Sequence, residues 1–98
     1  MEIKWTEEAS YSFEQTLEYW ENHNGSSTYS KKIIEEVKIA MLEVVQYPYS
    51  KQYSEILDLY RKSFFKGRFS IFYKIYEEEN IIWITHFRSN KQKPLFLI

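Results

Sequence analysis

The chain has 98 residues, which is long enough for one domain over residues 1–98. It contains no cysteine, and this excludes disulfides and thiolate metal sites. Nine Tyr, seven Phe and three Trp argue against disorder, and because the two histidines are far apart in sequence we expect neither a metal ion nor another cofactor. The formal net charge is −1 and the N-terminus lacks an apolar signal core, so we expect a soluble cytoplasmic protein.

The N-terminal residues predict a short strand that leads into a helix. Ile3 and Trp5 alternate with charged residues, as in a strand with one buried face. Thr6 is a suitable N-cap for a helix over residues 7–22, in which apolar residues recur at spacings of three and four. Gly25 then provides a stop signal for this first helix.

A second amphipathic helix follows almost at once. Ser26 or Ser27 can cap it, its apolar residues again have a helical period, and Pro48 ends it. Because the connection between the two helices is only a few residues long, we expect them to form an antiparallel hairpin.

The second half of the chain predicts three strands. Aromatic and β-branched residues are concentrated at residues 59–66, 69–76 and 81–87. The turn around Gly67 and the polar turn at residues 77–80 are short, so the strands should form an antiparallel meander. The resulting order, β-α-α-β-β-β, predicts an α+β fold in which a helical hairpin packs on a small, mainly antiparallel sheet.

Charge is divided unevenly between the two halves. Residues 1–60 contain five Lys and Arg against eleven Asp and Glu, whereas residues 61–98 contain eight against three. In the middle predicted strand, Ser70, Phe72 and Lys74 share one face, which is therefore part aromatic and part basic. This asymmetry indicates either an anionic partner or an ordinary solvated surface.

Five short segments follow one another in an order that is found in a known family. They are Trp-Thr-Glu-Glu-Ala at 5–9, Tyr-Arg-Lys at 60–62, Phe-Ser-Ile-Phe-Tyr-Lys-Ile at 69–75, Ile-Ile-Trp-Ile at 81–84 and Phe-Arg-Ser-Asn-Lys-Gln-Lys-Pro at 87–94. Together they resemble RelE/ParE-type toxins of bacterial type II toxin–antitoxin systems over essentially the whole chain. The resemblance implies a toxin that a cognate antitoxin neutralises.

The resemblance implies one of two activities, and one residue position bears on the choice. RelE-like members are ribosome-dependent mRNA endoribonucleases, whereas ParE-like members inhibit DNA gyrase. RelE-like members have an arginine three residues before the Tyr of the central strand, and here Ser70 stands there, before Tyr73. A neutral hydroxyl cannot replace a guanidinium at a developing phosphate charge. With the ParE-like ending that retains Asn90, Gln92 and Pro94, this favours a gyrase-binding toxin that is not an enzyme.

The alternative, a ribonuclease, depends on three residues. Arg68 precedes Ser70 by two residues, so we expect it on the same face, where it could substitute for the missing arginine in a shifted geometry. His86 titrates near neutral pH and could act as an acid or a base, and alternation puts Arg88 beside it. A hydrogen-bonded or solvated histidine at a strand end is the competing interpretation.

The basic residues of the second half could bind an antitoxin, gyrase or RNA phosphates. They are Arg61, Lys62, Lys66, Arg68, Lys74, Arg88, Lys91 and Lys93. We expect an antitoxin, because antitoxins of this family wrap a disordered C-terminal segment around the toxin, and an aromatic and basic surface suits such a ligand. A toxin–antitoxin hetero-oligomer would result. Arg61 has a second interpretation, an ion pair with a helix carboxylate.

A function of another class also remains open. The gene could encode an inactive remnant of a toxin or a plain protein-interaction module, and toxicity relieved by the product of an adjacent gene would separate these from a toxin.

Overall fold

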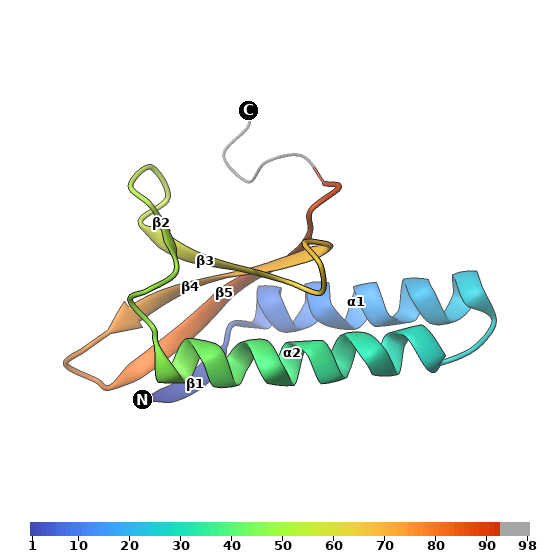
Figure 1. Cartoon of the computed structure of the whole chain (residues 1–98), viewed down its shortest axis with the longest axis horizontal. Helices are drawn as coiled ribbons and strands as arrows, with labels where there is room; N and C mark the ends of the chain where they lie inside the picture. Colours follow the sequence, from blue (N-terminus) through green and yellow to red (C-terminus); the bar gives the residue numbers. More distant parts are fainter. Residues whose placement is uncertain (93–98) are drawn as a thin grey trace.

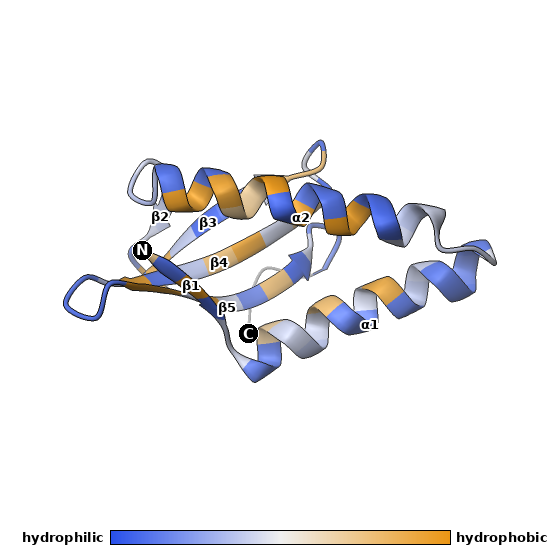
Figure 2. Cartoon of the chain, turned by 90° about the horizontal axis from the view of Figure 1, so that it is seen from below, coloured by the Kyte–Doolittle hydropathy of each residue, from blue (hydrophilic) through white to orange (hydrophobic). Residues whose placement is uncertain are grey.

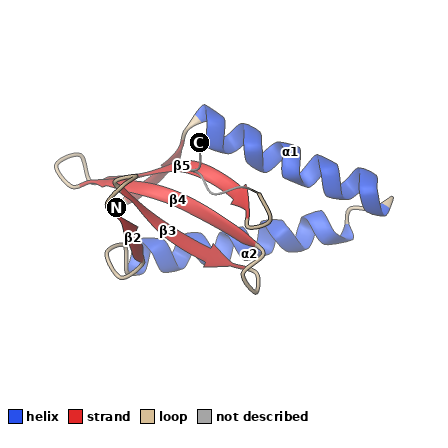
Figure 3. Ribbon diagram, turned by 90° about the horizontal axis from the view of Figure 1, so that it is seen from above, coloured by secondary structure: helices blue, strands red, loops and turns tan. Residues whose placement is uncertain are grey.

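The computed structural model describes residues 1–92 and has two layers, a helical hairpin and a five-stranded sheet. Figures 1 and 3 show both helices on the same face of the sheet. The elements are β1 (Glu2–Trp5), α1 (Glu7–Asn24), α2 (Thr28–Gln46), β2 (Gln52–Ser54), β3 (Leu59–Phe64), β4 (Phe69–Tyr76) and β5 (Ile81–Ser89). This confirms the α+β prediction. Neither α1 nor α2 is long and apolar enough to cross a membrane.

The strands lie in the order β1-β5-β4-β3-β2. β1 pairs with β5 in parallel, and every other neighbouring pair is antiparallel. The three-residue strand β2 lies in a segment that the sequence predicts as a loop, and it pairs with β3 from Gln52 opposite Arg61 to Ser54 opposite Leu59. The sheet therefore has one more strand than predicted.

Local interactions at the helix ends explain where the hairpin turns. The Thr6 hydroxyl accepts a hydrogen bond from the Ala9 backbone N–H at 3.1 Å, which confirms the predicted cap of α1. Gly25 ends α1 with a φ of 67°, a left-handed conformation that favours glycine. Ser27 occupies the cap position of α2 but makes no side-chain cap; instead the buried Ser30 hydroxyl donates to Glu21 of α1 at 2.9 Å.

The core lies between the hairpin and the helix-facing side of the sheet. α2 contributes the apolar stripe Ile33, Val37, Ala40 and Val44, and Figure 2 shows apolar residues along α2, β4 and β5. At the α1 side, the ring of Phe87 lies 5.0 Å from that of Phe13 and 6.5 Å from that of Trp5, centroid to centroid. Aromatic packing thus joins α1 to β1 and to the end of β5.

A β-bulge in β5 decides which side chains face the helices. Phe72 of β4 is opposite His86, but the next residue, Tyr73, is opposite Ile84, so Thr85 is the extra residue. The Thr85 hydroxyl donates to the Phe72 carbonyl oxygen at 3.2 Å. Because of this extra residue, both Ile84 and Phe87 are buried in the helix-facing core, and His86 is turned to the other side of the sheet.

The turn between β3 and β4 is longer than predicted. Phe65, Lys66 and Gly67 all have positive φ, at 54°, 56° and 77°, so β3 ends at Phe64 and not at Lys66. The Arg68 backbone N–H donates to the Phe65 carbonyl oxygen at 3.1 Å and closes the turn. The alternation of β4 therefore begins only at Phe69 and does not extend back to Arg68.

Candidate functional site

The open face of the sheet, which is the face away from the helices, presents basic and aromatic side chains from β3, β4 and β5. The three strands contain no Asp or Glu. Strand pairing forms two cross-strand rows on this face, namely Ser63, Ser70 and Arg88, and beside them Arg61, Phe72 and His86. A ligand on this face therefore meets positive charge that the strands themselves do not neutralise.

Ser70 lies at the centre of a hydrogen-bonded group that we call the Arg61 network: Arg61, Ser63, Ser70 and Asn90. The Ser70 hydroxyl accepts from Arg61 Nε at 3.0 Å and donates to Asn90 Oδ1 at 2.7 Å. Ser63 Oγ is 2.9 Å from Ser70 Oγ, and Arg61 Nη2 donates to Asn90 Oδ1 at 3.0 Å. Because Ser70 is 0% exposed and one hydroxyl has one hydrogen and two lone pairs, Ser63 must be the donor to Ser70.

Asn90 joins this network to the turn between β3 and β4. Its side-chain Nδ2 donates to the Gly67 carbonyl oxygen at 2.7 Å, and its backbone N–H donates to the Arg68 carbonyl oxygen at 2.9 Å. The asparagine of the predicted ParE-like ending thus holds the end of β5 against the turn. Two other residues of that ending, Lys93 and Pro94, lie outside the described residues.

Phe72 forms an apolar platform in the middle of the open face. Its ring lies under the Arg61 guanidinium at 5.8 Å and contacts the His86 ring edge to face at 6.1 Å. The residue is only 8% exposed and is not part of the helix-side core. The Phe72 ring therefore supports the Arg61 guanidinium from below and offers little surface of its own to a ligand.

His86 is half-buried, and its environment favours the neutral imidazole. Burial lowers the pKa of His86, the nearby Glu8 carboxylate opposes this, and the Arg88 guanidinium lowers the pKa further. His86 Nδ1 lies 2.9 Å from the Thr85 hydroxyl. His86 and Arg88 line a cavity of about 290 Å³ between β5 and the first turns of α1, so the structure brings these two predicted residues together.

The lowered pKa of His86 predicts a pH dependence of stability. Above pH 6.5, the ordinary pKa, both folded and unfolded chains hold a neutral imidazole; below it the unfolded chain binds a proton that the folded chain resists. The free energy of unfolding should therefore fall as the pH is lowered below 6.5. Urea denaturation at a series of pH values should show a shallower fall for His86→Asn, and an equal slope in both proteins would contradict this assignment.

Arg68 does not lie where the ribonuclease interpretation needs it. Its Nη1 donates to the Tyr29 hydroxyl of α2 at 3.0 Å, and its guanidinium lies 5.1 Å from the centre of the Phe65 ring. The prediction that Arg68 shares the face of Ser70 is therefore wrong, because the left-handed turn before β4 interrupts the alternation.

A larger cavity of about 580 Å³ lies where the turn between β3 and β4 meets the far end of the hairpin. Its walls combine aromatic and basic side chains, namely Trp20, Tyr29, Phe69, Arg68 and Lys91, together with Asn90 of the Arg61 network. The cavity and the open face are thus adjacent parts of one surface, joined at Asn90.

Two other predicted basic residues are paired with carboxylates of this chain. Lys62 Nζ lies 2.5 Å from Glu43 of α2, and this contact lowers the pKa of Glu43. The ion pair with a helix carboxylate that the sequence suggests for Arg61 belongs to Lys62, because adjacent residues of a strand face opposite sides. Lys74 pairs with Asp58 at 2.8 Å, whereas Lys66 and Lys91 are exposed in turns.

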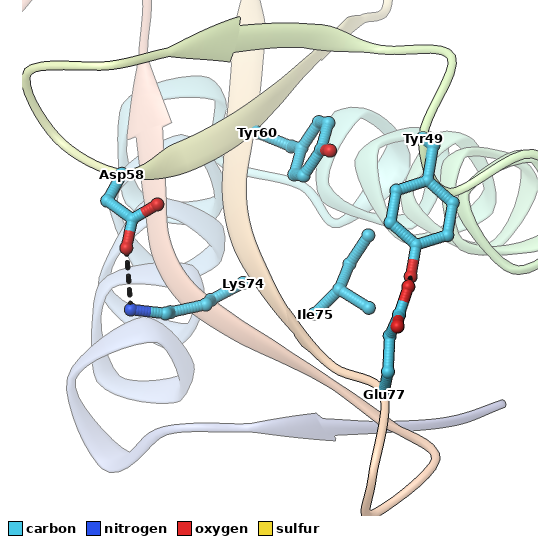
Figure 4. Close-up of a pocket in the computed structure, with 6 residues that line it drawn as sticks. All are labelled: Tyr49, Asp58, Tyr60, Lys74, Ile75 and Glu77. Atoms are coloured by element: carbon cyan, nitrogen blue, oxygen red, sulfur yellow. Dashed lines mark hydrogen bonds and ion pairs between the residues drawn. The ribbon is translucent and has the colours of Figure 1, made fainter.

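Figure 4 shows a smaller pocket at the opposite end of the sheet, of about 160 Å³. The polar groups around it bind one another, since Tyr49 donates to Glu77 and Lys74 pairs with Asp58. The hydrogen bond to Glu77 raises the pKa of Tyr49 to about 12, so its hydroxyl stays protonated as a donor. The Asp58–Lys74 pair holds the turn before β3 against β4 and neutralises Lys74, and the Tyr49–Glu77 hydrogen bond ties the segment before β2 to the turn after β4.

Comparison with known proteins agrees with the resemblance of the sequence. A family model described as the ParE toxin of the type II toxin–antitoxin system, parDE, matches residues 3–94. The match includes all of the helices and strands of the described structure except Glu2, the first residue of β1. No curated protein shows a significant similarity to the chain.

Proposed function

The chain belongs to the ParE toxin family of type II toxin–antitoxin systems, and on that basis we propose that it arrests growth by binding DNA gyrase and that a cognate antitoxin neutralises it. The family membership supports the toxin role and the existence of an antitoxin partner. The target and the mode of neutralisation are our inference from the open face.

Ser70 is the observation that carries the preference for gyrase binding over RNA cleavage. Cleavage by a 2′-hydroxyl needs cationic groups at the phosphate and a base and an acid within reach. The Ser70 hydroxyl is fully buried and its hydrogen-bonding capacity is used within the Arg61 network, so it offers no atom to a phosphate. Arg68, the proposed substitute, is bound to Tyr29.

The antitoxin would cover the open face and the adjacent cavity. Arg61, Arg88 and Lys91 supply positive charge there, and the aromatic side chains of Trp20 and Tyr29 line the cavity. An acidic and apolar segment that folds on binding fits this combination, since charge steers its approach and the aromatic rings provide the buried contacts.

Two assays on the purified full chain test the choice of target. We expect inhibition of gyrase supercoiling at stoichiometric toxin, and no cleavage of ribosome-bound mRNA. The product of the adjacent gene should restore supercoiling and should relieve growth arrest when the two proteins are expressed together.

The opposite result has a clear signature. Cleavage of ribosome-bound mRNA that is lost in His86→Ala and Arg88→Ala would favour the ribonuclease, whose support in the structure is the cavity that these two residues share. If the chain affects neither gyrase nor mRNA and does not arrest growth, it is an inactive member of the family.

A further inference from the structure

Within residues 1–92, hydrogen bonds occupy one edge of the Arg61 guanidinium and leave its other edge available. Nε donates to Ser70 and Nη2 donates to Asn90, so the edge formed by Nε and Nη2 is occupied by two neutral oxygens. The guanidinium has five N–H groups, and its second edge, formed by Nη1 and Nη2, has no hydrogen bond to a carboxylate within residues 1–92.

The donors and acceptors of the Arg61 network are matched in a way that fixes the orientation of the guanidinium. Ser70 receives hydrogen bonds from Arg61 and Ser63 and gives its only hydrogen to Asn90. The Asn90 amide oxygen accepts from Ser70 and Arg61, and its nitrogen donates to Gly67. No member can rotate without breaking a bond, so the guanidinium plane is set before any ligand arrives.

The available edge keeps its full positive charge in a partly dehydrated place. The acceptors at the occupied edge are a hydroxyl and an amide, so neither neutralises the guanidinium. Arg61 is half-buried and lies over Phe72, and Arg88 stands in the neighbouring row. A carboxylate that meets two parallel N–H groups there gains more than at an exposed arginine, because water screens the pair less.

A protein carboxylate fits this edge better than an RNA phosphate does. A guanidinium edge can bind a carboxylate or a phosphate in the same two-pronged way, so the surroundings decide. The aromatic ring of Phe72 under the guanidinium makes these surroundings less polar, which suits a peptide with an apolar residue beside its carboxylate. The chain as a whole carries a net charge of −1, with eleven acidic against five basic residues in residues 1–60, and this field disfavours a long polyanion.

We propose that Arg61 is a preset receptor for one Asp or Glu carboxylate of the antitoxin, bound by the edge formed by Nη1 and Nη2, and that Ser70 and Asn90 are positioning residues that act through it. This inference rests on the proposed neutralisation by an antitoxin. To that proposal it adds the chemical group of the antitoxin that is recognised, a carboxylate, and the residues that orient the Arg61 guanidinium.

Binding of the purified cognate antitoxin to the full-length toxin tests the proposal. Arg61→Lys keeps the charge but loses the two-pronged edge, so we expect roughly 30-fold weaker binding or more, with an unchanged circular dichroism spectrum. Ser63→Asp, at an exposed position two residues along the same strand face, adds an internal carboxylate that competes for Arg61 and should also weaken binding. Ser63→Asn changes the same position without adding a charge and should bind more tightly than Ser63→Asp. Lys38→Ala, at an exposed side chain of α2, is the control that should bind like the natural chain.

A double-mutant cycle identifies the carboxylate and separates positioning from a loss of stability. Each Asp and Glu of the antitoxin is changed to Asn or Gln. For one of these changes, the loss of binding affinity should be roughly tenfold smaller when the toxin carries Arg61→Lys, Ser70→Ala or Asn90→Ala than when the toxin is the natural chain. Unchanged affinity in Arg61→Lys and Ser63→Asp, or a cycle without coupling, would overturn the receptor while leaving the toxin–antitoxin pairing intact. Absence of any binding by the natural toxin would instead contradict the proposed function.

Discussion

Replacing Ser70 with arginine should lower the free energy of unfolding by roughly 3–5 kcal/mol. The side chain at this position is 0% exposed, and its oxygen lies 3.0 Å from Arg61 Nε, so the new guanidinium would be buried against another cation. A domain of this size has about 5–15 kcal/mol in total, so the variant would lose a large share of its stability. Urea denaturation followed by tryptophan fluorescence measures the change.

Ser70→Ala is the control for this experiment. It removes the hydroxyl that joins Arg61 to Asn90 but adds no charge, so we expect a loss of about 1–3 kcal/mol. A Ser70→Arg protein that is as stable as the natural chain and cleaves ribosome-bound mRNA would show that position 70 is open to a ligand. That result would reverse our preference for the ParE-like activity.

Replacing Phe87 with alanine should cost about 3–5 kcal/mol, as large as any single change in the core. Phe87 is 2% exposed, and its ring lies 5.0 Å from Phe13, 5.7 Å from Phe69 and 6.1 Å from Phe64, so the change leaves a cavity among aromatic rings on three elements. Thermal denaturation should show a large decrease in the melting temperature.

Two controls distinguish packing at Phe87 from a general effect of mutation. Phe87→Leu keeps much of the volume and should cost less than half as much. Tyr19→Ala, at a side chain that is 57% exposed, should change stability by about 0.5 kcal/mol or less. If Phe87→Ala behaves like Tyr19→Ala, the ring is not part of the core, and the position of the bulge in β5 must be different.

The helices and the three long strands could be predicted from the sequence because their signals are local. Thr6, Gly25 and the spacing of apolar residues act within one or two turns of helix. Strand β2 could not be found in this way, since three residues are too few for a pattern of alternation and it depends on its pairing with β3. The early end of β3 was missed because Phe65 and Lys66 are not residues that favour a left-handed backbone.

The site was less predictable because its contacts connect residues that are distant in sequence. Arg61 meets Ser70 of the next strand and Asn90 of the last turn, and no spacing rule brings these together. Charge composition also does not distinguish Arg61 from Lys62, the next residue in the strand. The sheet separates them, since one faces the open side and the other is paired with Glu43.

The parallel pairing of the first strand with the last has a consequence for how the molecule forms. Glu2 is opposite Ile81 and Trp5 is opposite Ile84, so almost the whole chain must be present before β1 has a partner. Contacts of such high sequence separation slow folding and make unfolding cooperative. During synthesis β5 and the turn after it also bring His86, Arg88 and Asn90, so we expect a nascent chain to acquire its sheet and its binding surface in the same late step.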